Sequence, residues 1–321
     1  MGLDFTAIDF ETANGFRGSP CAVGLSRVRD GRIVEEAFWL MRPPAGHDHF
    51  EPRNIEIHGV TPQQVASQPR FAEVFDEISE FLADDVLVAH NAAFDTGVIK
   101  AALQASARSG PAFSYACTVI LARLSYSLPS YSLPFVAEAA QVPLINHHDA
   151  IEDARACAGI LIDIAAKHGA ASVVELYQLL NLALPKMPAF VPDPLAPATP
   201  PAKVAANWFG WPEEGANPQA NALADHNHPL FGQTVVFTGN LQISRGTAKQ
   251  RAAQLGAQPA STVTGKTTVL VVGDGFIAAD LRRGDTGAGR VTAKARRVLE
   301  LHGKGQKIEV LSEGEFMQMI G

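Results

Sequence analysis

Proline is concentrated in one stretch of the chain, and this stretch limits how the whole chain can fold. Ten of the 21 prolines fall between Pro185 and Pro229. Each proline fixes its φ angle and lacks a backbone N–H, so a regular helix or a central strand is not expected there. The 321 residues therefore predict two domains, residues 1–183 and 229–321, joined by a semi-extended linker at residues 184–228.

An aromatic segment interrupts this linker. Residues 207–212 have the sequence Asn-Trp-Phe-Gly-Trp-Pro. Tryptophan side chains in a linker usually dock on another surface, because their large apolar rings are costly to expose. The sequence leaves open whether they pack on one of the two domains or bind a partner.

Net charge is unevenly distributed along the chain. The total of −7 divides into −12 over residues 1–225 (14 Lys+Arg, 26 Asp+Glu) and +5 over residues 226–321 (12 Lys+Arg, 7 Asp+Glu). The basic part is suited to attract a phosphate backbone, and bound cations would offset some of the acidic charge in the first part. Simple surface solubility explains the same asymmetry, so charge alone leaves both interpretations open.

Cysteine usage bears on the location of the protein. Cys21, Cys117 and Cys157 are far apart and form no CxxC pair. This spacing argues against a disulfide framework or a zinc site and indicates a reducing compartment. No apolar run approaches the roughly 20 residues that a membrane helix needs. The sequence therefore predicts a cytoplasmic protein with no membrane partner.

Hydrophobic periodicity in the N-terminal domain predicts antiparallel strands followed by alternating strands and helices. A hairpin turn signal, Asp30-Gly31, separates two of the strands, which are expected at residues 3–10, 22–28, 32–41 and 86–89. Helices are expected at residues 71–82, 94–107, 131–140, 150–167 and 172–180. This order predicts an α/β fold in which helices pack on a mixed sheet.

The periodic pattern restarts after Pro229. Strands are expected at residues 234–238, 268–272 and 307–311, and helices at residues 244–255, 292–301 and 313–320. Ser244 is the expected cap of the first helix. The C-terminal domain is therefore predicted to be a small α/β module with an order close to βαββαβα.

Four acids recur where buried strands end or helices begin. Asp9 and Glu11 are two residues apart in a strand, which places their carboxylates on one face. Asp95 follows the strand at residues 86–89, and Asp153 lies in the first turns of a later helix. Clustered carboxylates repel one another unless a divalent cation offsets their charge. Each acid alone is explained more simply, as a solvated strand end or a helix-dipole acid.

In their order along the chain, these residues resemble the DEDD exonuclease superfamily. The motifs are Asp9-Phe10-Glu11-Thr12, His90-Asn91-Ala92-Ala93-Phe94-Asp95, and His148 followed by Asp153. Residues 57–61, Ile-His-Gly-Val-Thr, are similar to the family's segment between the first two motifs. The histidine places the resemblance in the DEDDh branch, which includes the proofreading subunit of bacterial replicative polymerases. The resemblance implies a ribonuclease H-like mixed sheet with flanking helices.

The resemblance also implies roles for individual residues. Two Mg²⁺ or Mn²⁺ ions would be held by Asp9, Glu11, Asp95 and Asp153, with Asp9 bridging them. His148 would act as the general base, because histidine is the side chain whose ordinary pKa lies near neutrality. His147 is a rival for this role, and the motif spacing favours His148.

Three further residues, Thr12, His58 and Phe94, would border the terminal nucleotide according to the same resemblance. Phe94 is explained equally well as a core residue. The implied activity is metal-dependent 3′–5′ exonuclease hydrolysis, with DNA as the favoured substrate and a DNA polymerase or repair protein as a candidate partner. An RNA 3′-end-trimming exonuclease is the neighbouring alternative, because these acids serve both polymers. A non-catalytic scaffold is the third, although a scaffold has no need of four repelling carboxylates.

Residues 229–321 resemble a BRCT domain in their opening strand, Phe231–Gly239, in Leu255-Gly256-Ala257 and in Thr267–Val272. The last helix has Phe316 and no tryptophan, which makes it more similar to the BRCT domains of bacterial NAD-dependent ligases and clamp loaders. The hydroxyl of Thr238, the amide of Gly239 and the charge of Lys294 are suited to converge on one phosphate. A domain that only contacts other proteins is the alternative.

Overall fold

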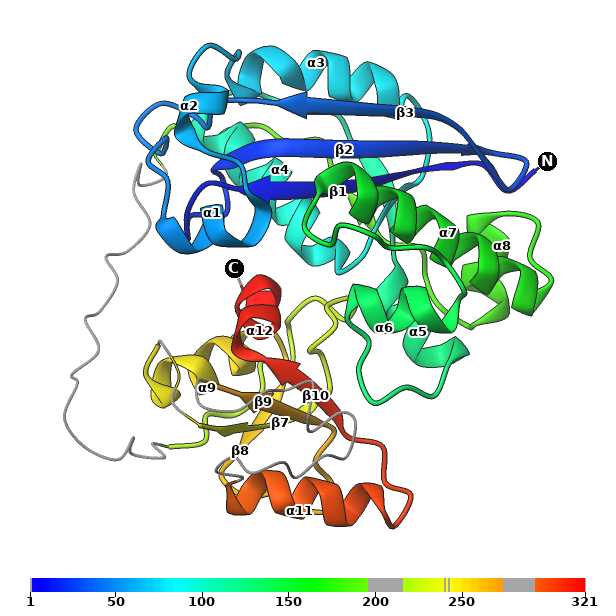
Figure 1. Cartoon of the computed structure of the whole chain (residues 1–321), viewed down its shortest axis with the longest axis vertical. Coiled ribbons are helices and arrows are strands. Elements are labelled where there is room, and N and C mark those ends of the chain that lie inside the picture. Colours follow the sequence, from blue (N-terminus) through cyan, green and yellow to red (C-terminus); the bar gives the residue numbers. More distant parts are fainter. Residues whose placement is uncertain (1, 196–215, 240, 242, 274–291, 321) are drawn as a thin grey trace. The chain divides into compact units, whose positions relative to one another are not determined.

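The structure, a computed structural model, describes residues 2–195, 216–239, 241, 243–273 and 292–320. The chain divides into two compact units, the first with the elements up to residue 187 and the second with those from residue 234 (Figure 1). The tryptophan-bearing segment at residues 207–212 lies outside the described residues.

Six strands form the mixed sheet of the first unit. In chain order they are β1 (Phe5–Thr12), β2 (Pro20–Arg29), β3 (Arg32–Leu40), β4 (Leu87–Ala89), β5 (Phe113–Cys117) and β6 (Lys186–Met187). In space their order is β3-β2-β1-β4-β5-β6. The first three strands pair antiparallel, and β1, β4 and β5 pair parallel. The mixed α/β sheet expected from the sequence is therefore confirmed.

The hairpin between β2 and β3 forms at the predicted turn. Asp30 and Gly31 have φ angles of 50° and 70°, the positive values that a tight two-residue hairpin turn requires. Glycine adopts this conformation without strain, and aspartate is among the few other residues that tolerate it.

Eight helices are described in the first unit: α1 (Pro52–His58), α2 (Pro62–Val65), α3 (Phe71–Leu82), α4 (Ala92–Ala105), α5 (Thr118–Ser125), α6 (Leu133–Ala139), α7 (Ala150–His168) and α8 (Val173–Leu179). Helix α7 packs across β1 and β2, whereas α4 contacts β1, β4 and β5 (Figure 1). The side chain of Asp149 caps α7 by accepting a hydrogen bond from the N–H of Ile151. The first turns of α4 and α7 therefore lie near β1, the strand that holds Asp9 and Glu11.

The region predicted as a linker is more ordered at its two ends than expected. Strand β6 lies inside it and pairs with β5 at the edge of the sheet. An edge strand tolerates neighbouring prolines, because it needs hydrogen bonds on one side only. At the other end, the side chain of Asn217 accepts a hydrogen bond from Lys249, and Nε2 of His228 donates to the carbonyl oxygen of Met319 within the second unit.

The second unit has a four-stranded, all-parallel sheet in the order β10-β9-β7-β8. Its elements are β7 (Thr234–Thr238), α9 (Arg245–Gln254), β8 (Gln258–Ala260), β9 (Val269–Val272), α11 (Ala293–His302), β10 (Glu309–Ser312) and α12 (Glu313–Ile320). The predicted order βαββαβα is therefore found among its described elements. The predicted cap is also present, because the side chain of Ser244 accepts a hydrogen bond from the N–H of Thr247.

No single helix in the described part of the chain is long and apolar enough to cross a membrane. Helices α7 and α8 together reach the necessary length and apolar composition, but the pair is bent by 52°.

Candidate active site

Strand β1 carries Asp9 and Glu11 on the face that α7 covers. Asp9 is paired with Gly24 of β2, and residues paired directly across antiparallel strands share a face of the sheet. A Cβ atom at Gly24 would lie 2.3 Å from the carbonyl oxygen of Ala150, the first residue of α7. One carboxylate oxygen each from Asp9, Glu11 and Asp153 lie within 4.8 Å of one another. Three of the four acids singled out in the sequence are thus brought together.

Asp95, the fourth acid, lies in the first turn of α4 and is 1% exposed. Its Oδ1 accepts a hydrogen bond from the backbone N–H of Phe10, at 3.1 Å. Its Oδ2 is buried and has no hydrogen-bond partner among the described groups. A buried carboxylate oxygen without a donor is costly, and a divalent cation is a suitable partner for it. The donor set therefore fits a metal site.

The electrostatics of the site point the same way. Burial raises the pKa of Asp9 and of Glu11, and repulsion from Asp153 is the next cause for both. Burial also raises the pKa of Asp95 to about 8, against the hydrogen bond from Phe10. Ionised acids in this site are therefore unfavourable in the protein alone. A cation with oxygen ligands would remove that cost.

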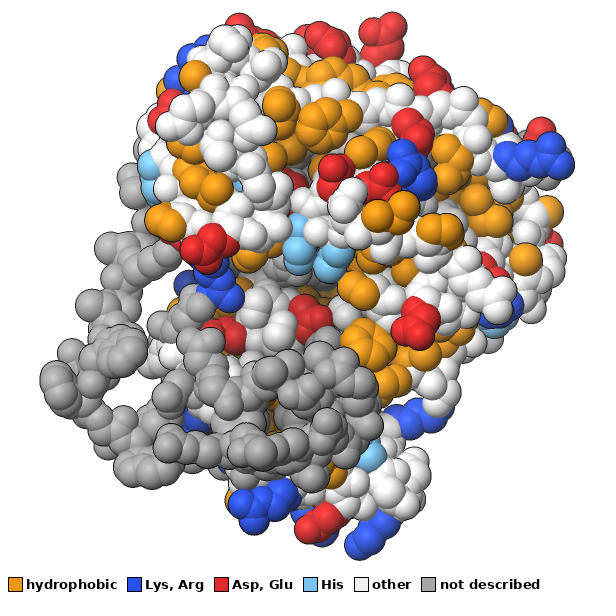
Figure 2. All heavy atoms as spheres, in the orientation of Figure 1, with side chains coloured by type: hydrophobic (Ala, Val, Ile, Leu, Met, Phe, Trp, Pro, Cys, Tyr) orange, Lys and Arg blue, Asp and Glu red, His pale blue; other side chains and the backbone are white. Residues whose placement is uncertain are grey.

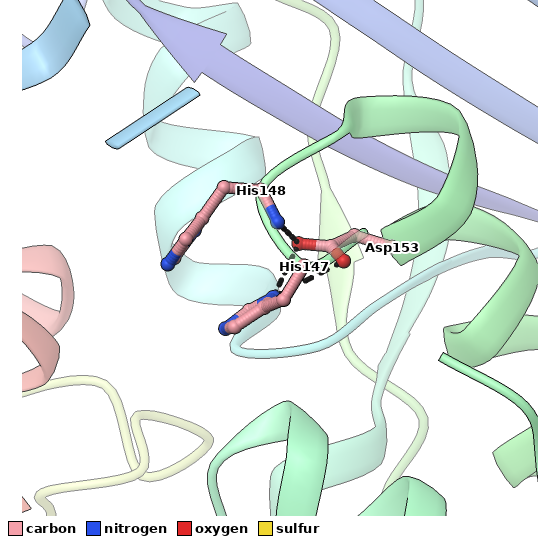
Figure 3. Close-up of side chains that lie close together, drawn as sticks. All are labelled: His147, His148 and Asp153. Carbon is pink, nitrogen blue, oxygen red and sulfur yellow. Dashed lines mark hydrogen bonds and ion pairs between the residues drawn. The ribbon is translucent and has the colours of Figure 1, made fainter. Parts of the chain in front are cut away.

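Both candidate histidines lie beside Asp153, in different ways. Nδ1 of His147 is 2.9 and 3.1 Å from the two carboxylate oxygens of Asp153, whereas His148 donates its backbone N–H to Oδ2 at 3.0 Å. The two imidazole rings stack with centroids 3.8 Å apart. Figure 3 shows the ring of His147 beside the carboxylate, and one ring nitrogen each of His147 and His148 and a carboxylate oxygen of Asp153 lie within 4.8 Å of one another.

This arrangement depends on an unusual backbone. His148 has a φ angle of 75°, in the left-handed region that few residues other than glycine adopt. Strain of this kind is most often found at functional sites. The motif spacing did not predict the contact of His147 with Asp153. Spacing along the sequence carries no information about the left-handed backbone conformation of His148.

Of the three residues expected to border a nucleotide, His58 has both ring nitrogens engaged. Nδ1 accepts the N–H of Val60 at 3.0 Å, and Nε2 lies 3.1 Å from the carbonyl oxygen of Thr12. Burial lowers the pKa of His58, so the neutral ring with its proton on Nε2 fits both contacts. His58 therefore ties the end of α1 to the end of β1. Phe94 follows Ala93 in α4, and the guanidinium of Arg17 lies 5.6 Å from its ring centroid.

The second unit brings its three singled-out residues to one end of β7. Thr238 is 2% exposed, and its hydroxyl is 2.6 Å from that of Thr292. The ammonium of Lys294 donates to the carbonyl of Phe237 at 3.0 Å. Gly239 has a φ of 75°, and a Cβ there would lie 3.1 Å from the carbonyl oxygen of Gly273.

Comparison with known proteins bears on the first unit. Residues 6–161 match the family model RNase_T, an exonuclease family. The DNA polymerase III PolC-type of Clostridium perfringens is 34% identical over 164 residues, which cover 49% of this chain and 11% of that protein. The same protein of Thermotoga petrophila is 28% identical over 180 residues, covering 56% and 13%. The chain thus spans little more than a tenth of the length of these curated relatives.

Among solved structures, exonuclease X in complex with 5′ overhanging duplex DNA is similar at 27% identity and a TM-score of 0.43. The match covers 55% of this chain and 98% of that one. The residues matched by the family model include every acid of the site and both histidines beside Asp153. The part of the chain that matches the exonuclease family RNase_T, residues 6–161, therefore contains the whole candidate site.

Proposed function

We propose that this protein is a metal-dependent 3′–5′ exonuclease that releases nucleoside monophosphates from DNA 3′ ends. The observation that carries the proposal is the meeting of carboxylate oxygens from Asp9, Glu11 and Asp153 within 4.8 Å inside an exonuclease domain. The buried, unpartnered Oδ2 of Asp95 supports it. Carboxylate oxygens are the ligands that Mg²⁺ and Mn²⁺ prefer.

Asp9, Glu11, Asp95 and Asp153 would hold two such ions, which would supply charge stabilisation at the attacking and leaving oxygens. The residues of the chain do the remaining work. His148 takes the proton from the attacking water as the new O–P bond forms. The bond from phosphorus to the 3′ oxygen breaks, and that oxygen takes a proton from solvent and leaves as the 3′-hydroxyl of the shortened strand. His148 then returns its proton to solvent. Thr12, His58 and Phe94 would border the terminal nucleotide.

DNA is the proposed substrate, because the curated relatives named above are DNA polymerases. A DNA polymerase or repair protein is the proposed partner, and the cytoplasm the proposed location, which the three buried free cysteines suit. RNA 3′-end trimming remains the alternative. Incubation of matched end-labelled DNA and RNA oligonucleotides with Mg²⁺, with Mn²⁺ and with EDTA separates these activities. Metal-dependent shortening of DNA alone is expected, and RNA as the better substrate would overturn the choice of polymer.

For the second unit we propose a BRCT-like domain, residues 229–321, that contacts nucleic acid. Its all-parallel sheet and βαββαβα order support this proposal. Figure 2 shows blue Lys and Arg side chains over α11, where Arg296 and Arg297 are exposed. Residues 226–321 carry a net charge of +5, which would attract a phosphate backbone.

A 5′-phosphorylated DNA end is the proposed specific ligand of this domain, so Lys294→Ala is expected to erase the preference for a 5′ phosphate. The change removes the charge beside Thr238 and Gly239. Thr238→Ala should weaken the preference less, because a neutral hydrogen bond contributes about 1 kcal/mol net. Fluorescence anisotropy at fixed salt compares oligonucleotides with and without the phosphate, using full-length protein that also carries Asp9→Ala to prevent digestion.

Lys307→Ala is the matched control, because Lys307 is exposed and follows α11. This variant should reduce salt-dependent affinity for both oligonucleotides equally. Equal affinities in the parent protein would leave the domain as a protein-contact module.

A further inference from the structure

The loop after β1 is fitted closely onto α4. A Cβ atom at Gly18 of the loop would lie 2.7 Å from the backbone carbonyl carbon of Ala101 in α4. A Cβ atom at Gly97 of α4 would lie 2.5 Å from Nη1 and 2.6 Å from Cδ of Arg17. One glycine on each side therefore allows this approach.

Glycine at position 97 is unexpected, because this position lies in the interior of helix α4. Glycine at such a position destabilises a helix relative to alanine. Alanine would place a methyl group in the space that the Arg17 side chain occupies. The space that the Arg17 side chain occupies is thus kept open at a cost in the stability of helix α4.

From this position the Arg17 side chain contacts the first turn of α4. Its Nη1 donates a hydrogen bond to the carbonyl of Ala93 at 3.1 Å, and its guanidinium carbon lies 5.6 Å from the ring centroid of Phe94. The next residue is Asp95. A cation is normally unfavourable at the N-terminal end of a helix, where the helix dipole is positive. Helix stability alone therefore does not account for Arg17, and the carboxylate of Asp95 offsets its charge.

We propose that Arg17 is a positioning residue, which seats the first turn of α4 so that Asp95 and Phe94 are held at the end of β1. This inference rests on the proposed nuclease function. In it Arg17 acts through its contacts with Ala93 and Phe94. The metal affinity of the site and the alignment of the terminal nucleotide then depend on Arg17, although its side chain holds neither the metal nor the nucleotide.

Calorimetric titration of the full-length protein with Mn²⁺ tests the proposal without relying on activity. Arg17→Met is expected to raise the Mn²⁺ concentration at half-saturation about tenfold. It should also lower kcat on DNA by roughly 10–100-fold, because a displacement of about 1 Å at a reacting site costs up to about a hundredfold. KM for DNA should change less than kcat.

Gly97→Ala provides a second variant that keeps the arginine and improves helix propensity. Its methyl group should displace Arg17 and reproduce both effects. The double variant should be no worse than Arg17→Met alone, because the two changes remove the same contact. Arg108→Met is the matched control. Arg108 also lies over a phenylalanine ring, 5.8 Å from the centroid of Phe75, and donates to a helix carbonyl, that of Ala72 in α3.

The control variant should keep the parent's Mn²⁺ titration and kcat. Parent-like Mn²⁺ affinity and kcat in Arg17→Met would overturn the proposal, and so would an additive loss in the double variant. An inactive parent protein would instead count against the proposed nuclease function, while the Mn²⁺ titrations would still decide the role of Arg17.

Discussion

Replacing Asp9 by alanine is expected to abolish nuclease activity. Asp9 lies with Glu11 and Asp153 in the group of three close carboxylate oxygens. Metal ions at such a site supply several kcal/mol of transition-state stabilisation. A loss of about 4 kcal/mol corresponds to roughly a thousandfold in rate. Release of labelled mononucleotides from DNA in the presence of Mg²⁺ measures the loss.

The same variant should fold, and its metal-free form should melt at a higher temperature than the parent. Burial raises the pKa of Asp9 in the folded state. An acid of this kind destabilises the fold increasingly as pH rises above its unfolded value of about 4, up to its raised folded value. Removing Asp9 at neutral pH therefore removes a destabilising buried acid.

Asp76→Ala is the control for this experiment, because the side chain of Asp76 is 77% exposed on α3. Its activity and metal-free melting temperature should stay near those of the parent. Full nuclease activity of the parent protein in excess EDTA would contradict the metal-dependent mechanism itself.

Replacing His148 by alanine is expected to lower turnover by about 10²–10⁴-fold, the usual contribution of a general base. His148 is not among the four acids proposed to hold the metal ions, so Mn²⁺ binding measured by calorimetry should change little. Turnover at saturating DNA and Mg²⁺ is the quantity to compare.

His147→Ala is the paired variant, since Nδ1 of His147 contacts both carboxylate oxygens of Asp153. Loss of this contact should alter Mn²⁺ binding more than the chemical step. If His147→Ala abolishes turnover and His148→Ala is mild, the base is His147 and the assignment from motif spacing is wrong.

Several of the elements that the sequence predicted have a regular apolar face, although strand β3, which was also predicted, has no buried residue. Helix α3 buries Phe71, Val74, Phe75, Ile78 and Leu82, which recur at helical spacing. Helix α1 was not predicted, and none of its side chains is buried, so it has no apolar period to detect. Strand β5 was also missed, because it is short and leads directly into α5 with no turn residue between them. The pattern of apolar residues is therefore most informative where an element packs with one face.

The candidate site divides in a similar way. Asp9 and Glu11 could be placed together because strand geometry alone puts residues two apart on one face. Their meeting with Asp153 depends on the packing of α7 on the sheet, and only the family resemblance indicated it. The contact of Arg17 with α4 could not be predicted from the sequence, because this contact joins a loop to a helix far along the chain.

The absence of a side chain at Gly24 has a consequence for how natural variation in this protein should be interpreted. Even a methyl group there would press on the backbone of Ala150 and push the start of α7, with Asp153, away from Asp9. Selection should therefore hold position 24 as strictly as the acids themselves. A variant at this position would have the phenotype of a lost catalytic group, although glycine contributes no chemistry of its own.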